Sequence, residues 1–247
     1  MEAMMNILVI GSAPDAVHVK NWDLSIFDHV IAINNAWQVT DKWDQLIFPY
    51  NFPDKNKPAT LFAHQAIVTE EQFVPAQNFF GGFVYAGATM AFTAGYWSLA
   101  TFKPSKICFL GCNMHYSQSG ATHFYGTGEP DPLRKDISLT SLKACSYRML
   151  IMSKIHGCDV VSLSAGETNL HIPQTSFHAL TDYQAEIVIS KQRLDEALKR
   201  EKQLNYYVED GRYWEKEKLF CQNELEKLDQ IWIDALSSGS DNSNRAK

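Results

Sequence analysis

The chain lacks several patterns that would place it directly in a functional class. It has no G-x-G-x-x-G fingerprint, which leaves a hydride-transfer cofactor unsupported, and no G-x-S-x-G elbow, which argues against a serine hydrolase. Its five cysteines are odd in number and form no C-x-x-C pair, so we expect reduced core thiols in a cytoplasmic protein. With 22 Lys and Arg against 28 Asp and Glu, the net charge of −6 argues against a nucleic-acid partner.

Membrane-targeting features are also scarce. Residues 1–6 carry no basic group, so no signal peptide is expected. The uncharged stretch from Val84 to Phe102 approaches the length of a bilayer span, but it is rich in Gly, Ser and Thr and poor in large aliphatic residues. We therefore predict a helix packed inside a soluble domain, and no transmembrane segment.

The sequence does contain an alternation of short apolar runs and helical segments. Runs of this kind are typical of strands buried on both faces of a parallel sheet, joined by helices that cover it. The pattern predicts an α/β fold, a Rossmann-like doubly wound and mainly parallel sheet, in one domain over residues 1–176. The predicted strands are 6–10, 27–35, 42–48, 107–110 and 159–164, and the predicted helices include 88–102 and 138–156.

The composition changes near Pro173. From residue 181 to 236 charged residues dominate, and apolar residues recur at helical spacing on either side of Asp210-Gly211. This predicts a helical hairpin appendage over 177–236, which packs on the α/β domain or forms a homo-oligomer through its helices. A partner-binding coiled coil is the alternative. Residues 237–247 are expected to be a disordered tail.

A glycine turn follows the first predicted strand. The turn consists of Gly11, Ser12, Ala13 and Pro14. It is a strand-to-helix turn of the type that aims free backbone N–H groups at an anion. The pattern repeats after the strand at 107–110, where Gly111 precedes Asn113. Ligands of open α/β sheets bind at the carboxyl ends of the strands, which makes both turns candidate contacts.

Two amides, Asn34 and Asn35, end the second predicted strand. They can donate hydrogen bonds to phosphate or sugar oxygens without adding charge, or they can cap the next turn.

The long segment 117–136 holds the candidate base, His123. An imidazole can take a proton from an acceptor hydroxyl near neutral pH, although an isolated loop histidine has no spacing signature. Tyr125 and Tyr116 could donate hydrogen bonds to a departing phosphate, and Arg134 could offset its charge. No metal site is predicted, because the neighbouring acidic and histidine side chains lack compact ligand spacing.

In their order along the chain these motifs resemble the bacterial sialyltransferases of glycosyltransferase family forty-two and related sialyltransferase-like proteins. Five family elements have a counterpart between about residues 6 and 164. The family's G-x-G-P-S turn is similar to residues 11–15, and the asparagine that follows it in the family is similar to Asn34 or Asn35. The family's S-G turn is similar to Ala86-Gly87, and its S-H-Y loop is similar to residues 122–124. Its L-x-G-x-D-x-Y strand end is similar to residues 110–116, where Asn113 lies near the position of the family's acid.

The resemblance implies a metal-independent, inverting transfer of a sugar acid from a CMP-linked donor to a glycan acceptor, with no further cofactor. His123 would deprotonate the acceptor, tyrosines would steady the CMP phosphate, and backbone amides near Gly11 and Gly87 would hold the nucleotide. Asp15 and Ala86 replace serines of the family pattern, which leaves the donor sugar open.

Two other hypotheses stand beside this one. The strand and glycine pattern also resembles the pterin diphosphokinase-like group, which would require ATP and Mg²⁺. A non-catalytic nucleotide-binding or assembly protein, docking through its helical hairpin, is the third, and Asp15 and Ala86 favour it.

Overall fold

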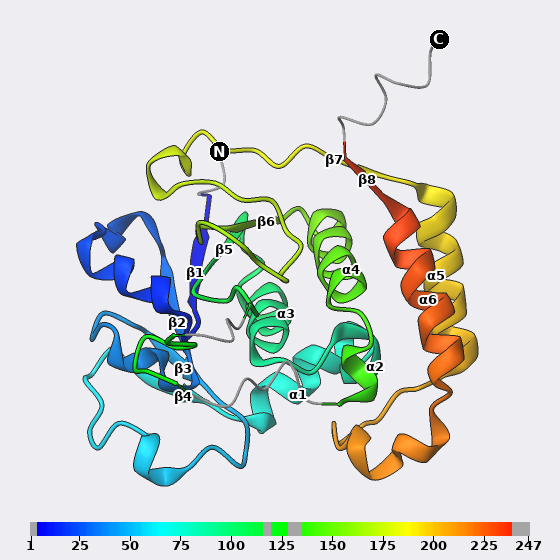
Figure 1. Ribbon diagram of the computed structural model, residues 1–247, viewed down its shortest axis with the longest axis horizontal. Helices are drawn as coiled ribbons and strands as arrows, with labels where there is room; N and C mark the ends of the chain where they lie inside the picture. Colours follow the sequence, from blue (N-terminus) through cyan, green and yellow to red (C-terminus); the bar gives the residue numbers. More distant parts are fainter. Residues whose placement is uncertain (1–3, 116–119, 128–134, 239–247) are drawn as a thin grey trace.

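Six parallel strands form the central sheet, in the order β4-β3-β2-β1-β5-β6 (Figure 1). The computed structural model describes residues 4–115, 120–127 and 135–238. The predicted α/β fold with a Rossmann-like parallel sheet is therefore confirmed. The strands are β1 Asn6–Ile10, β2 His29–Ile33, β3 Gln45–Ile47, β4 Ala66–Val68, β5 Lys106–Leu110 and β6 Asp159–Ser162.

The central strand β1 contacts two separate hydrophobic cores. Ile7 and Val9 belong to one core, and Leu8 and Ile10 to the other, as the alternation of side chains along a strand requires. All four are fully buried, which explains why the strand is a continuous apolar run.

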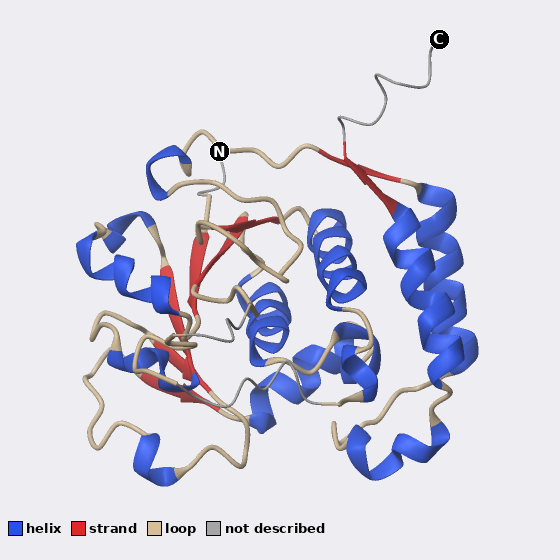
Figure 2. Cartoon of the chain, in the orientation of Figure 1, coloured by secondary structure: helices blue, strands red, loops and turns tan. Residues whose placement is uncertain are grey.

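Helices cover the two faces of the sheet differently (Figure 2). One face is covered by four α-helices: α1 Glu70–Phe79, α2 Phe83–Ala86, α3 Met90–Phe102 and α4 Leu142–Ile155. The other face carries short 3-10 helices, including η1 Pro14–Asn21, η2 Leu24–Ile26 and η3 Asn34–Gln38. Among the described residues, no helix has both the length and the apolar character needed to cross a bilayer.

The C-terminal hairpin shares the core of the α/β part. Helices α5 Lys191–Leu204 and α6 Gln222–Ala235 pack on each other, and α6 packs on α4 (Figure 1). The buried side chains of Ala197, Leu228 and Trp232 belong to the same core as α3 and α4. The apolar stripe of α6 is thus covered within one chain.

A two-stranded antiparallel ribbon closes the hairpin. It pairs β7 Ile187–Ile189 with β8 Leu236–Ser238. The disordered tail predicted from residue 237 is therefore wrong for 237 and 238, whose backbone pairs with β7; residues 239–247 lie outside the described part of the chain.

The strand order fixes where a ligand would bind. The chain moves outward from β1 through β2, β3 and β4 and then returns to place β5 on the other side of β1. Loops at the carboxyl ends of β1 and β5 consequently leave in opposite directions, which opens a crevice at that edge.

Candidate functional site

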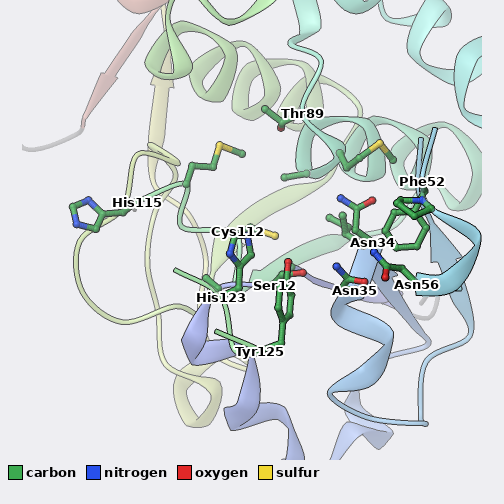
Figure 3. A pocket seen from close by; sticks show the side chains of 18 of the residues that line it. Ser12, Asn34, Asn35, Phe52, Asn56, Thr89, Cys112, His115, His123 and Tyr125 are labelled. Atoms are coloured by element: carbon green, nitrogen blue, oxygen red, sulfur yellow. The ribbon is translucent and has the colours of Figure 1, made fainter. Parts of the chain in front are cut away.

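A pocket of about 740 Å³ lies at the carboxyl ends of β1, β2 and β5. Its walls come from the turns after these strands, the segment 52–56, the first turn of α3 and the loop around His123. Figure 3 shows His123 and Tyr125 near Ser12 in the middle of the view, Asn34, Asn35, Asn56 and Phe52 grouped on one side, and His115 on the other.

The two glycine turns on the floor of this pocket are in direct contact. Gly11 N donates to Leu110 O at 2.8 Å, and Ala13 N donates to Gly111 O at 2.9 Å. A Cβ atom on Gly11 would lie 2.3 Å from Gly111 O, and Gly111 itself has φ of +68°, so both positions require glycine. The prediction that the first turn aims its free amides at an anion is therefore wrong for Gly11 and Ala13, because the carbonyl groups of Leu110 and Gly111 accept hydrogen bonds from those amides.

The first turn of α3 supplies an anion-binding wall instead. Thr89, Met90 and Ala91 line the pocket, and the Thr89 side chain caps the helix by accepting from Phe92 N at 3.3 Å. The first amides of a helix have no intrahelical partners, and its dipole adds partial positive charge at this end. The amino end of this 13-residue helix is a position of the kind that favours a phosphate group.

Ala86 and Gly87 lie behind this wall, outside the pocket lining. Ala86 ends α2 fully buried, and Gly87 O accepts from Gln77 Nε2 at 3.3 Å. Gly87 has φ of +82°, and a Cβ atom there would lie 2.8 Å from the Phe92 ring. Its glycine is thus required by packing against α3.

Asn34 and Asn35 present unsatisfied amide groups at the pocket wall. Both side-chain Oδ1 atoms are buried and have no hydrogen-bond partner among the described residues. Asn34 also adopts a left-handed backbone with φ of +51°, which asparagine tolerates better than most residues. Buried polar atoms without partners are uncommon, and a ligand with hydrogen-bond donors would satisfy these two.

His123 is the titratable group best placed for proton transfer. It is 9% exposed, its ring stacks on Tyr125 with centroids 4.9 Å apart, and its Nδ1 lies 2.9 Å from Thr122 Oγ1. The loop is held to the first glycine turn by Phe124 N, which donates to Ser12 O at 3.0 Å. Burial lowers the pKa of His123, so the neutral imidazole, which can accept a proton, prevails at pH 7.

The charge of the pocket favours an anionic ligand. Its described lining carries the positive charge of Lys55, the neutral His123 and His115, whose Nε2 lies 3.3 Å from a Glu167 carboxylate oxygen, and it includes no carboxylate. Asp15, which follows the first glycine turn, lies outside this lining, and its Oδ1 accepts from Asn113 Nδ2 at 3.3 Å. The Asp15 carboxylate therefore does not form part of the described pocket wall.

The sequence-predicted residues divide into three groups. The pocket brings some of them together, leaves others outside its lining, and for two the structure gives no description. The pocket lining contains Gly11, Ser12, Ala13, Asn34, Asn35, Gly111, His123 and Tyr125. It does not contain Pro14, Ala86, Gly87 or Asn113. The remaining two, Tyr116 and Arg134, lie outside the described residues.

Sequence reasoning missed other parts of the wall, notably Phe52, Lys55, Asn56 and Thr89. Thr89 carried a usable signal, because a threonine immediately before a helix is a preferred cap. The segment 52–56 follows β3, and its proximity to the α3 end depends on the tertiary fold alone.

In the described part of the chain, no three His, Cys, Asp or Glu side chains gather into a metal-binding group.

Comparisons with protein-family models, with curated proteins and with solved structures give no match.

Proposed function

We propose that this protein is a glycosyltransferase of sialyltransferase-like type, which transfers a sugar from a CMP-linked donor to a glycan acceptor. The observation that carries the proposal is the placement of a buried, neutral His123 on the wall of a pocket that also contains the amino end of α3 and no described carboxylate. Such a pocket offers an anion site and a base in one cavity.

The chemical step follows from these groups. The acceptor hydroxyl oxygen attacks the anomeric carbon, the bond from that carbon to the phosphate oxygen breaks, and CMP leaves with the bonding electrons. The hydroxyl proton passes to His123. The positive end of the α3 dipole stabilises the leaving phosphate, and Lys55 adds a further positive charge at the pocket. Attack from the side opposite the leaving group inverts the anomeric centre.

A titration by calorimetry with CMP, CDP, UDP, GDP and ATP, each with and without Mg²⁺, tests the nucleotide part. We expect saturable CMP binding without metal. Selective ATP binding that needs Mg²⁺ would instead favour the pterin diphosphokinase-like hypothesis, and no binding of any nucleotide would reject both enzymes in favour of an assembly role.

Transfer activity tests the base. With a CMP-activated sugar acid and an acceptor that the wild type uses, His123→Ala should abolish transfer while CMP binding persists. His115→Ala is the matched control, because His115 lines the same pocket but is paired at 3.3 Å with the Glu167 carboxylate. Full activity of His123→Ala would remove the base from the mechanism.

A further inference from the structure

Two exposed aromatic side chains from distant parts of the chain stack beside the pocket. Tyr50 follows β3, and Trp214 belongs to the 3-10 helix η8 Tyr213–Leu219 in the C-terminal hairpin. Their ring centroids are 5.8 Å apart at an interplanar angle of 15°, yet Tyr50 remains 64% and Trp214 46% exposed. We call this pair the aromatic platform.

The aromatic platform is next to the pocket by chain connectivity. Tyr50 precedes the pocket-lining residues Phe52 and Pro53 by two and three positions, and two residues span at most about 7 Å. In Figure 1 the segment after β3, in light blue, and η8, in orange, both lie on the lower side, away from the N-terminus at which β1 begins.

Buried contacts also fix the platform relative to the pocket. Tyr213, the neighbour of Trp214, is 4% exposed and donates from its hydroxyl to Asp136 Oδ2 at 2.5 Å. Asp136 also holds Ser138, whose Oγ accepts from Ala88 N just before the α3 cap. The connection from η8 to the anion-binding wall thus runs through a short series of hydrogen bonds.

Gly211 strengthens this attachment. It has φ of +75°, and a Cβ atom there would lie 3.0 Å from Phe83 and 3.1 Å from Val74. The chain entering η8 therefore packs tightly on α1 and α2, which makes the platform a preformed surface.

We propose that the aromatic platform is the subsite for the acceptor sugar, a neutral pyranose that stacks on the exposed ring faces while its hydroxyl reaches toward the pocket. This rests on the proposed function. One face of a pyranose carries several C–H groups with partial positive charge, which match the negative face of an aromatic ring. Tyrosine and tryptophan also supply a polar atom at the ring edge for a sugar hydroxyl.

The test uses saturation-transfer NMR on the whole 247-residue chain, with methyl β-galactoside, methyl β-glucoside, lactose, cellobiose and maltose as probes, with and without CMP. We expect saturation transfer from the wild type to at least one probe. In Trp214→Ala and Tyr50→Ala the affinity for that probe should fall about tenfold, and the double variant should lose the signal.

Two matched controls separate stacking from general surface effects. Phe62→Ala removes a 60% exposed ring from the same segment as Tyr50, and Tyr207→Ala removes a 47% exposed ring from the hairpin. Both should bind the probe within about twofold of the wild type, well below the tenfold step expected for the platform. Trp214→Phe, which keeps a ring, should restore most of the affinity.

The outcomes distinguish this proposal from the function on which it rests. If no probe binds, or if binding persists in the double variant while circular dichroism shows native folding, the platform is not a sugar subsite. CMP binding by calorimetry should be unchanged in both platform variants. Sugar binding at the platform without CMP binding would leave the subsite standing and overturn the assignment of the donor.

Discussion

Two groups of polar side chains differ in whether the chain satisfies the hydrogen bonds of their buried atoms. In the first, Arg148 bonds to both carboxylate oxygens of Glu201 at 2.8 and 3.0 Å, to the Tyr96 hydroxyl at 2.9 Å and to Phe80 O at 2.5 Å. Trp232 Nε1 also donates to Glu201 at 2.9 Å.

In the second group, at the pocket, the Oδ1 atoms of Asn34 and Asn35 are buried without a partner among the described residues. The chain thus satisfies the Arg148–Glu201 network, which joins the hairpin to the core, and leaves the two pocket oxygens without a partner in the described part of the chain. Unpartnered buried oxygens also occur elsewhere in that part: Asn78, whose Nδ2 donates to Glu209 O of the hairpin, has one in its Oδ1. The difference indicates a structural role for the first group and a binding role for the second. The predictions below test that distinction.

The largest effect is expected at His123. Replacing it with glutamine keeps a polar side chain of similar length but removes the base, so transfer should slow by about 10²- to 10⁴-fold. The free energy of unfolding, from urea denaturation, should change by less than about 1 kcal/mol. A variant that loses stability and keeps its turnover would place His123 in the structural group instead.

Arg148→Met should have the opposite signature. It leaves the Glu201 carboxylate buried without its cation, and breaking such a pair costs about 3–5 kcal/mol of unfolding free energy. CMP affinity of the folded protein should stay within about threefold of the wild type, which is under 1 kcal/mol.

The double variant Arg148→Met/Glu201→Leu is the control for this pair. It removes both charges together, so its cost should be smaller than the sum of the two single costs. A loss of under about 1 kcal/mol in Arg148→Met alone would mean that the network does not hold the hairpin in place.

Local patterns in the sequence predict the parallel sheet well, because a strand such as β1 is buried on both faces and therefore continuously apolar. They also place Asn34 and His123 at one site, since ligands bind at the carboxyl ends of strands. The pair Arg148 and Glu201 could not be predicted, because 53 residues separate them and no local pattern marks a buried ion pair.

The unsatisfied amides allow a smaller test. Asn34→Gly keeps the left-handed backbone, which glycine adopts readily, and removes only the amide; CMP affinity should fall about three- to tenfold, the value of one hydrogen bond. Asn34→Ala should lose the same affinity and be about 1 kcal/mol less stable than Asn34→Gly, since a Cβ atom strains that conformation. Equal CMP affinity in all three proteins, measured by calorimetry, would remove Asn34 from the ligand contacts.

The smallest effect concerns the orientation of the base and its titration. Thr122→Val removes the hydroxyl 2.9 Å from His123 Nδ1, so the imidazole is less well oriented and turnover should fall about three- to tenfold. The rate should decline on the acid side in both proteins, because protonated His123 cannot accept a proton.

Burial lowers the pKa of His123, so this decline should begin below the ordinary value of 6.5. Burial is also the cause of that shift, so Thr122→Val should lower the rate at every pH without moving the position of the acid limb. The same lowered pKa predicts that the contribution of His123 to stability is constant above about pH 6.5. That contribution falls as the pH drops from there toward the folded-state pKa, because the unfolded chain binds the proton first. In His123→Gln that contribution should vanish from urea denaturation measured between about pH 5 and 7, whereas an unchanged pH dependence would assign it to another group.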